Sequence, residues 1–589
     1  MPETIEQFDT DILIIGSGGA GLFAALHAQK AAPDLEVTLA VKGLIGKCGC
    51  TRMVQGGYNV ALNPSDSIER HFMDTIVGGK WLPDQDLAWR LVTTAIERIH
   101  ELENELGCFF DRNPDGSLHQ KAFAGQSFDR TVHKGDLTGI EIINRLMEQV
   151  MRNPLRRLEE CRAIALIKTP AGDALSGVVM IDMRTGKFFF VRAKAVLLAS
   201  GGGPTMYLYH TPSGDKTCDG MAMALDAGLE LRDMEMVQFH PTGLLAGTDT
   251  RMTGTVLEEG LRGAGGYLLN GDGERFMLDY DPAGERATRD VVSRGIYAEM
   301  RNGKTTPNGG VYIEMKHLGP ENVAKRFKGM VERCADSGFD LAGDRVEVVP
   351  TAHYMMGGMV FHGDCETKID GLFIAGEDAG GVHGANRLGG NGVANSTVFG
   401  GIAGDAMAAY VKSGKGGLRD PDRSAIDAAV ANAVAPFSKK KGNINGLRER
   451  LYNVMWDDVG IIRDHEGLTR ATAELDDIAA ELAESGVDDT DRAFNLTWHD
   501  RLNMESLVEI SRAITFASLA RKDSRGAHYR ADYPEAGDLN TTAYTVVTKE
   551  EGTFRATTRP VEFTIVKPGE SLISDDIGAP PATAGNTAP

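Results

Sequence analysis

The sequence contains no run of about 18 consecutive apolar residues, the length that a helix needs to cross a membrane. Its first ten residues, MPETIEQFDT, are acidic and hold no apolar stretch, so they do not resemble a secretory signal peptide. We therefore expect a cytoplasmic protein. Attachment to the cytoplasmic face of the inner membrane would have to come from partner subunits.

Cysteine is scarce and scattered. The chain has seven cysteines, with no C-x-x-C pair, no haem-attachment motif and no iron–sulfur spacing. An odd, irregular set is also unlike a disulfide framework. Cys48 and Cys50 flank a single glycine, a spacing that is wrong for zinc and has no neighbouring His or Cys to help. We expect reduced thiols, no metal, and neither cluster nor haem in this chain.

A dense block of Lys and Arg is missing too, and the formal net charge is −21. Because a nucleic-acid-binding protein usually carries a basic face, the sequence argues against a nucleic-acid partner. The chain has 589 residues, more than one hydrophobic core supports, so we expect about two to four domains.

Glycine is abundant, and its first cluster lies in a predicted strand–turn–helix unit. Gly16, Gly18, Gly19 and Gly21 lie between an apolar strand, DILII, and a stretch with helical spacing, LFAALHAQKAA. Such a turn lets a pyrophosphate approach the N-terminus of the helix. The acidic residue that commonly ends the second strand is absent, because that strand, LEVTLAV, ends at Lys42. The turn alone would also fit an ordinary glycine turn.

Several further blocks are more specific. They are VQFHPTG (237–243), LRGAGGYLLNGDGERFM (261–277), RDVVSR (289–294), PTAHYMMGG (350–358), GLFIAGEDAGG (371–381), ANRLGGNGVANSTVFGGIAGDA (385–406) and RKDSRGAHYRADYPE (521–535). Together they closely resemble the succinate dehydrogenase/fumarate reductase flavoprotein family, in the family's order and over most of residues 8–535.

The resemblance implies an α/β, multidomain (α+β) fold. A glutathione-reductase-type, Rossmann-like FAD-binding domain would be interrupted by a capping domain and followed by a helical domain and a small C-terminal domain. We place the FAD-binding domain at 1–235 and 351–415, the capping domain at 236–350, the helical domain at 425–540, and the C-terminal domain with a disordered tail at 541–589.

The resemblance also implies an extended FAD and a dicarboxylate beside it. The residues that it assigns to FAD are Gly16, Gly18, Gly19, Gly21, Lys42, Cys50, Thr51, Gln55, Gly56, Gly57, Asp219, Glu377, Asn391 and Val393. Those that it assigns to the substrate are His240, His353, Arg387, Phe123 and Glu258. Arg289 would transfer the proton, supplied through Glu259 and Arg262, although Arg–Glu–Arg is also a common structural ion-pair arrangement.

Two positions depart from the family pattern. Glu258 replaces a Thr or Ser whose hydroxyl bonds a substrate carboxylate. Because like charges about 4 Å apart repel by several kcal/mol at an effective dielectric near 20, Glu258 is turned away, or protonated, or faces a substrate whose distal end is not a plain carboxylate. Cys50 replaces the histidine that tethers the flavin covalently, which favours non-covalent FAD over a thioether.

The sequence therefore predicts an FAD-dependent oxidoreductase that interconverts succinate and fumarate. A separate iron–sulfur subunit would exchange its electrons, and membrane-anchor subunits could accompany it. An L-aspartate oxidase-like enzyme stays open, because an amino-bearing substrate would suit Glu258. An FAD-containing nucleic-acid-modifying protein shares the N-terminal fingerprint, but the charge and the Arg/His set oppose it.

Overall fold

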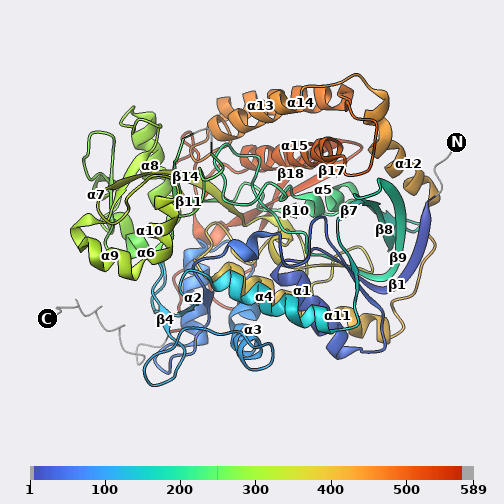
Figure 1. Cartoon of the computed structure of the whole chain (residues 1–589), viewed down its shortest axis with the longest axis horizontal. Helices are drawn as coiled ribbons and strands as arrows, with labels where there is room; N and C mark the ends of the chain where they lie inside the picture. The colour runs from blue at the N-terminus through green and yellow to red at the C-terminus, as the bar shows by residue number, and fades with distance from the viewer. Residues whose placement is uncertain (1–4, 248–249, 574–589) are drawn as a thin grey trace.

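The computed structural model describes residues 5–247 and 250–573 (Figure 1). The predicted disordered tail falls largely on residues 574–589, which lie outside the described part. The strands are β1 (Glu6–Ile15), β2 (Val37–Ala40), β3 (Tyr58–Asn59), β4 (Gln120–Lys121), β5 (Thr131–Val132), β6 (Arg156–Leu158), β7 (Cys161–Lys168), β8 (Leu175–Asp182), β9 (Lys187–Leu198), β10 (Leu231–Arg232), β11 (Val237–Leu244), β12 (Tyr267–Leu269), β13 (Val311–Glu314), β14 (Arg345–Met355), β15 (Gly358–Met359), β16 (Leu372–Ile374), β17 (Ala543–Glu550) and β18 (Thr553–Pro560).

The α-helices follow in the same numbering. They are α1 (Gly19–Ala31), α2 (Ile68–Gly78), α3 (Gln85–Asn104), α4 (Thr138–Arg152), α5 (Asp219–Asp226), α6 (Gly260–Gly263), α7 (Met277–Tyr280), α8 (Arg289–Arg301), α9 (Pro320–Arg326), α10 (Lys328–Ala335), α11 (Asn391–Lys412), α12 (Arg423–Val434), α13 (Ile444–Asp457), α14 (His465–Glu484) and α15 (Leu496–Ala520).

The central sheet has the order β6-β2-β1-β9-β8-β7, with β16 added beside β9. Strands β6, β2, β1, β9 and β16 are parallel, whereas β7, β8 and β9 pair antiparallel. The apolar run of β1 is buried on both faces, as a strand inside a parallel sheet should be. Because the parallel strands end at one edge, the glycine turn after β1 and the segment after β16 meet there, although they are far apart in sequence.

Helices α1 and α11 pack against each other beneath that edge. Their approach depends on glycine: a Cβ at Gly400 would lie 2.6 Å from the Ala20 carbonyl oxygen, and one at Gly404 would lie 2.4 Å from that of Ala24. The two helices begin at the same place, α1 at the first glycine turn and α11 after the second. Their N-termini therefore face one shared space.

Residues 244–348 form a second hydrophobic cluster of their own. The sheet β11-β14-β13-β12 supports it, and side chains of α8 and α10 such as Val292, Ile296 and Met330 fill it. In Figure 1 this part stands to one side of the central sheet. Strands β11 and β14 run out of it toward the FAD-binding part, so they carry residues of both parts to the junction.

The hairpin β17–β18 lies in the region predicted as a small C-terminal domain. Strand β17 pairs with β10, and β10 pairs with β15, so the hairpin completes a four-stranded sheet with strands from the region predicted as FAD-binding. A lone two-stranded hairpin has little stability in water. Here the hairpin is stabilised because β17 pairs with β10 as part of the four-stranded sheet.

Helices α12–α15 lie where the sequence predicts helices, and α15 ends at Ala520. The segment 521–535 continues as loop and turns rather than helix. Its arginines explain the change: Arg521 contacts Glu235 at 2.5 Å, and Arg530 donates to the backbone carbonyl oxygen of Ser518 at 2.8 Å. The Arg521 contact ties the end of α15 to the segment between β10 and β11, and the Arg530 contact folds the loop back onto α15.

Candidate active site

A cavity of about 490 Å³ lies between the regions predicted as FAD-binding and capping. Helices α1 and α11, the short 3-10 turn Cys50–Met53, strand β11 and the start of α8 all contribute to its walls. The predicted site residues that line it are Gly18, Gly19, Cys50, Thr51, Gln55, Gly56, Gly57, Phe123, His240, Glu258, Glu259, Arg289, His353, Glu377, Arg387 and Val393. The structure therefore brings together residues from most of the quoted blocks.

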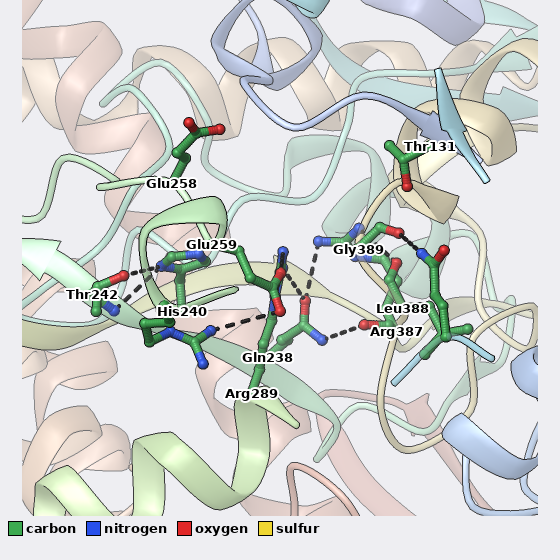
Figure 2. Close-up of polar contacts among 12 residues, drawn as sticks. Thr131, Gln238, His240, Thr242, Glu258, Glu259, Arg289, Arg387, Leu388 and Gly389 are labelled. Atoms are coloured by element: carbon green, nitrogen blue, oxygen red, sulfur yellow. Dashed lines mark hydrogen bonds and ion pairs between the residues drawn. The ribbon is translucent and has the colours of Figure 1, made fainter. Parts of the chain in front are cut away.

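Arg289 and Glu259 form the centre of the polar network (Figure 2). Arg289, the first residue of α8, donates from Nη2 at 2.7 Å and from Nε at 3.0 Å to Glu259 Oε2. Burial favours the neutral form of Glu259, but Arg289 and Arg262 outweigh it and hold its pKa below the usual value. Glu259 therefore stays ionised between two guanidinium groups.

Arg262 completes the predicted trio. It follows Glu259 by three residues, one helical turn, and its Nη2 lies 3.6 Å from Glu259 Oε1. Its Nη1 donates to the Glu285 carbonyl oxygen at 2.6 Å, while its Nε and Nη2 are buried without a hydrogen bond. Burial lowers the pKa of this arginine. Arg262 is therefore a buried guanidinium with two unused donor atoms beside an ionised carboxylate.

Two neutral histidines face each other across the cavity wall. His240 and His353 have ring centroids 5.5 Å apart. Burial first, and then the nearby arginines, lower both pKa values well below the usual one. The Thr242 amide donates to His240 Nδ1 at 3.3 Å, so this ring carries its hydrogen on Nε2. His240 is thus a hydrogen-bond donor rather than a cation.

Arg387 is buried in the loop that precedes α11. Its guanidinium lies 4.4 Å from the centre of the Tyr354 ring, and its Nε has no hydrogen-bond partner. Burial first, and then repulsion from Arg289, lower its pKa to about 10. The group therefore remains charged at neutral pH with bonding capacity unused, which suits a carboxylate ligand.

The side chain of Glu258 points away from that of Glu259. In Figure 2 its side chain points in a different direction from that of Glu259 and His240. Its Oε2 lies 3.5 Å from the Lys121 ammonium group, which reaches across from β4. Burial raises the pKa of Glu258, and Lys121 only partly opposes this rise. The carboxyl group is thus turned toward Lys121 and its pKa is raised, while its role toward a substrate stays a prediction.

The chain matches the family model described as FAD binding domain over residues 11–393, and the model described as fumarate reductase flavoprotein C-term over residues 448–572. An uncharacterized FAD-dependent oxidoreductase of Methanocaldococcus jannaschii is 43% identical over 89% of this chain and 94% of its own length. A fumarate reductase (CoM/CoB) subunit of Methanothermobacter marburgensis is 40% identical over 90% of this chain and 95% of its own. Among solved structures, a variant of the Escherichia coli quinol fumarate reductase flavoprotein superposes with a TM-score of 0.89, at 32% identity over 96% of this chain and 99% of that one.

The chain belongs to the succinate dehydrogenase/fumarate reductase flavoprotein family. The predicted family, fold class and enzyme class are thereby confirmed, and this flavoprotein is an FAD-dependent oxidoreductase. Within residues 5–247 and 250–573, no helix is long and apolar enough to cross a membrane.

The flavoprotein's own residues fit FAD. Helices α1 and α11 both open toward the cavity without a side-chain cap at Gly18 or Gly390, which leaves backbone N–H groups available for phosphate oxygens. Gln55 Oε1, at this cavity, and Ser17 Oγ, at a smaller cavity beside the glycine turn, are buried without hydrogen-bond partners. Gly21 acts differently, because a Cβ on it would lie 1.9 Å from the Gly16 carbonyl oxygen. It permits the turn and does not touch the cavity.

Lys42 and Asp219 lie beyond the turn, around a smaller cavity of about 50 Å³ that also includes Gly16 and Gly18. Lys42 donates to Asp219 at 2.7 Å. Burial opposes ionisation of Asp219, but Arg162 and Lys42 overcome it and keep its pKa far below normal. The flavoprotein thus places an anchored carboxylate here, in place of the acid missing from the second strand.

Cys50 and Glu377 share the cavity wall between α1 and α11. Burial, and then the charge of Glu377, raise the pKa of the Cys50 thiol strongly. Burial also raises the pKa of Glu377 to about 7, although its Oε1 accepts a hydrogen bond from the Met355 amide at 2.9 Å. The thiol is therefore protonated at neutral pH.

Asn391, predicted as an FAD ligand, has a side chain whose hydrogen bonds are made by other residues of the chain. Its Oδ1 accepts from Asn59 at 2.8 Å and lies 3.0 Å from His71 Nε2, and its amide group donates to Thr75 at 3.1 Å. Asn391 is fully buried and does not line the cavity. Because β3 and α2 satisfy its side chain, it fixes the start of α11.

Sequence reasoning missed four polar residues around the site. Thr242 orients His240, Thr211 Oγ1 lies 2.8 Å from His353 Nδ1, and Tyr354 stacks under Arg387. Gln238 bonds two of the predicted arginines. Three of these lie inside quoted blocks, within two residues of a predicted histidine, and that proximity was the available signal.

Proposed function

We propose that this flavoprotein interconverts succinate and fumarate at the cavity between its FAD-binding and capping parts. The observation that carries the proposal is the convergence of two buried arginines, Arg289 and Arg387, with two neutral histidines around one cavity. A four-carbon dicarboxylate carries a charge at each end and needs cationic and donor groups at both. The cavity walls provide both cationic and hydrogen-bond donor groups.

Arg387 and His353 would hold one carboxylate. The Arg387 guanidinium is held rigidly by Tyr354 and keeps a free Nε donor. His240, fixed as an Nε2 donor by the Thr242 amide, would donate to the opposite end. Because neutral histidines do not compete with the arginines as cations, they add hydrogen bonds without adding repulsion between the walls.

Arg289 would exchange the proton at the substrate carbon. Its Nη2 donates to Glu259 Oε2, so a proton lost from Arg289 would be replaced through that carboxylate, which would first take a proton from Arg262. Glu259 lies in turn 3.6 Å from Arg262. The line Arg262–Glu259–Arg289 keeps each charge paired as a proton moves, which lowers the cost of moving charge inside the protein. FAD held along the glycine turn and the start of α11 would supply the hydride chemistry.

We propose that FAD is bound without a covalent link. Only a thiolate is a good nucleophile, and burial beside Glu377 holds Cys50 as the thiol. Phosphate binding by the two helix N-termini and the Lys42–Asp219 pair offers retention without a tether.

We further propose that the electron partner is a separate iron–sulfur protein, with membrane anchors behind it and a location on the cytoplasmic face of the membrane. The relative from Methanothermobacter marburgensis is described as one subunit of a fumarate reductase, which supports assembly with other chains. Co-purification of a brown complex would support this proposal. A yellow protein that stays alone would oppose it.

Glu258 favours a second candidate, an L-aspartate oxidase-like reaction. A carboxyl group at the cavity wall would suit an amino group of the substrate. Its pairing with Lys121, however, leaves it an acceptor that is already engaged. The succinate/fumarate proposal therefore stands first.

A dye-linked assay separates these candidates. The purified protein is tested with succinate and an oxidising dye, with fumarate and a reduced dye, and with L-aspartate. Turnover of succinate or fumarate supports the first proposal, and turnover of aspartate alone supports the second. No turnover of any of the three contradicts both.

A further inference from the structure

Gln238 joins the two buried arginines of the cavity (Figure 2). Its single Oε1 atom accepts hydrogen bonds from Arg289 Nη1 and from Arg387 Nη2, both at 3.1 Å. The residue lies on β11, two positions before His240, and is 1% exposed. One neutral oxygen is therefore the direct link between the group assigned to the proton and the group assigned to the carboxylate.

The hydrogen bonds of Gln238 Nε2 decide how the side-chain amide is oriented. Gln238 Nε2 donates to the Arg387 carbonyl oxygen at 2.8 Å and to Asn386 Oδ1 at 3.1 Å. A flipped amide would place its oxygen against the Arg387 carbonyl oxygen, which cannot donate, and its NH2 group against two guanidinium groups. The observed orientation satisfies all four contacts, so Oε1 has to face the arginines.

The two arginines need such a spacer because only one of them has an anionic partner. Arg289 is paired with Glu259. Arg387 makes no ion pair within 4.0 Å in the part of the chain that the structure describes, and Arg289 contributes to lowering its pKa. A carboxylate at position 238 would cancel part of the positive charge that an anionic substrate requires, whereas an apolar side chain would leave the repulsion unscreened.

We propose that Gln238 is the positioning residue that sets the spacing of Arg289 and Arg387 while leaving their charge available to a dicarboxylate. The inference rests on the proposed function, because it deepens the roles given there to the two arginines. The inference predicts that loss of the acceptor at position 238 disturbs both substrate binding and proton transfer. Gain of a negative charge there should disturb substrate binding alone.

Two variants of the full-length, flavin-loaded protein test this prediction. In Q238M the side chain keeps its length but loses its acceptor, so we expect kcat to fall roughly 10- to 100-fold and KM to rise about tenfold. In Q238E the oxygen still accepts from both arginines, so kcat should stay within about threefold while KM rises about tenfold at neutral pH. The protonated Glu has the donor and the acceptor of the amide, so the KM of Q238E should return toward the wild-type value as pH falls.

Gln85 offers a matched control. It is also buried, at 2% exposed, and its Oε1 accepts from the amides of Ile565 and Val566 far from the cavity. Q85M should lower the melting temperature without changing kcat or KM. If Q238M behaves like Q85M, or if KM of Q238E has the pH dependence of the wild type, the positioning role is wrong.

Malonate binding, followed through the absorbance of the bound flavin, gives a readout that needs no turnover. Weaker binding to Q238E and Q238M than to the wild type supports the inference even if succinate and fumarate are not turned over, in which case only the proposed reaction fails. Equal malonate affinity in all three proteins overturns the inference whatever the reaction. A wild type that neither binds malonate nor turns over a dicarboxylate overturns both.

Discussion

Arg289 contacts one oxygen of Glu259 with two of its nitrogens, Nη2 at 2.7 Å and Nε at 3.0 Å. This leaves the other oxygen, Oε1, on the side of Arg262 at 3.6 Å. The carboxylate thus contacts a different guanidinium through each oxygen. Under the proposed function, this arrangement would pass a proton from Arg262 through Glu259 to Arg289.

Replacing Arg289 by Ala should abolish turnover and leave the flavin bound. Removal of a positioned proton donor costs about 10²–10⁴-fold in rate. R289K should also be severely impaired, since one ammonium group does not reproduce the two contacts to Glu259. Initial rates with a dye acceptor, together with the flavin absorbance of the purified variants, provide the measurement.

The control for this prediction is Arg301 on the same helix, an exposed residue. R301A should keep the wild-type rate. Retained activity in R289A would remove this residue as the proton donor, whereas loss of flavin would show that it has a structural role.

Glu258 should make substrate affinity depend on pH. Burial raises its pKa, so at low pH the group is neutral, and as pH rises through that raised pKa it becomes charged and repels the substrate. The KM for fumarate or succinate should therefore increase with pH. E258T should lower KM roughly tenfold at the upper end of the range and flatten the profile.

Glu332 on α10 is a suitable control for the Glu258 prediction, because its side chain is 64% exposed on the same capping part. E332Q should leave the pH profile of KM unchanged. A wild-type KM that does not vary with pH, or an E258T variant with unchanged KM, would show that Glu258 does not face the substrate.

The flavin should separate from the polypeptide on denaturation. Because burial and Glu377 keep Cys50 protonated, we expect yellow colour in the supernatant after acid precipitation and an unmodified protein mass. C50S should release the same amount of flavin as the wild type. Colour that remains with the wild-type precipitate, and is lost in C50S, would establish a thioether.

His27 should stabilise the fold in acid more than at alkaline pH. It joins α1 to α11 and α3, with Nδ1 at 3.1 Å from Asp405 and Nε2 at 3.1 Å from Glu101. Burial favours the neutral ring, but Asp405 and Glu101 outweigh it and raise the pKa of His27. This contribution is full below the ordinary pKa near 6.5 and is lost as pH rises through the raised value.

Thermal unfolding of H27Q across that pH range tests the prediction. The variant should melt about 2–4 °C below the wild type at pH 6, and the difference should shrink as pH rises. His317, an exposed residue on the capping part, provides the control, and H317Q should show no such pH dependence. A gap between H27Q and the wild type that is constant with pH would contradict the linkage.

Much of the site could be predicted because its elements are local in sequence. The glycine turn needs only a strand, a helix and four neighbouring glycines, and all of these lie within residues 11–32. The resemblance implied the pair Glu259 and Arg262, and their separation by one helical turn is consistent with the ion pair found. The quoted blocks also named Arg289, Arg387, His240 and His353, and all of these line one cavity.

Other features depended on partners that spacing does not reveal. The side-chain contacts of Asn391 with Asn59, His71 and Thr75 could not be read from its sequence block. The pairing of β17 with β10 likewise leaves no local signal in the sequence of either strand. In each case a donor, an acceptor or a strand edge was completed by residues more than 300 positions away.

By itself, the sequence determined which chemical groups the site contains, because catalytic side chains are fixed by type and by short local motifs. Only the tertiary structure decided where they point. Gln238 faces two arginines because an amide must place its oxygen opposite donors, and Glu258 turns to Lys121 because a buried carboxyl seeks a cation. These side-chain orientations depend on hydrogen bonds and ion pairs between segments that are distant in sequence, so no local sequence pattern predicts them.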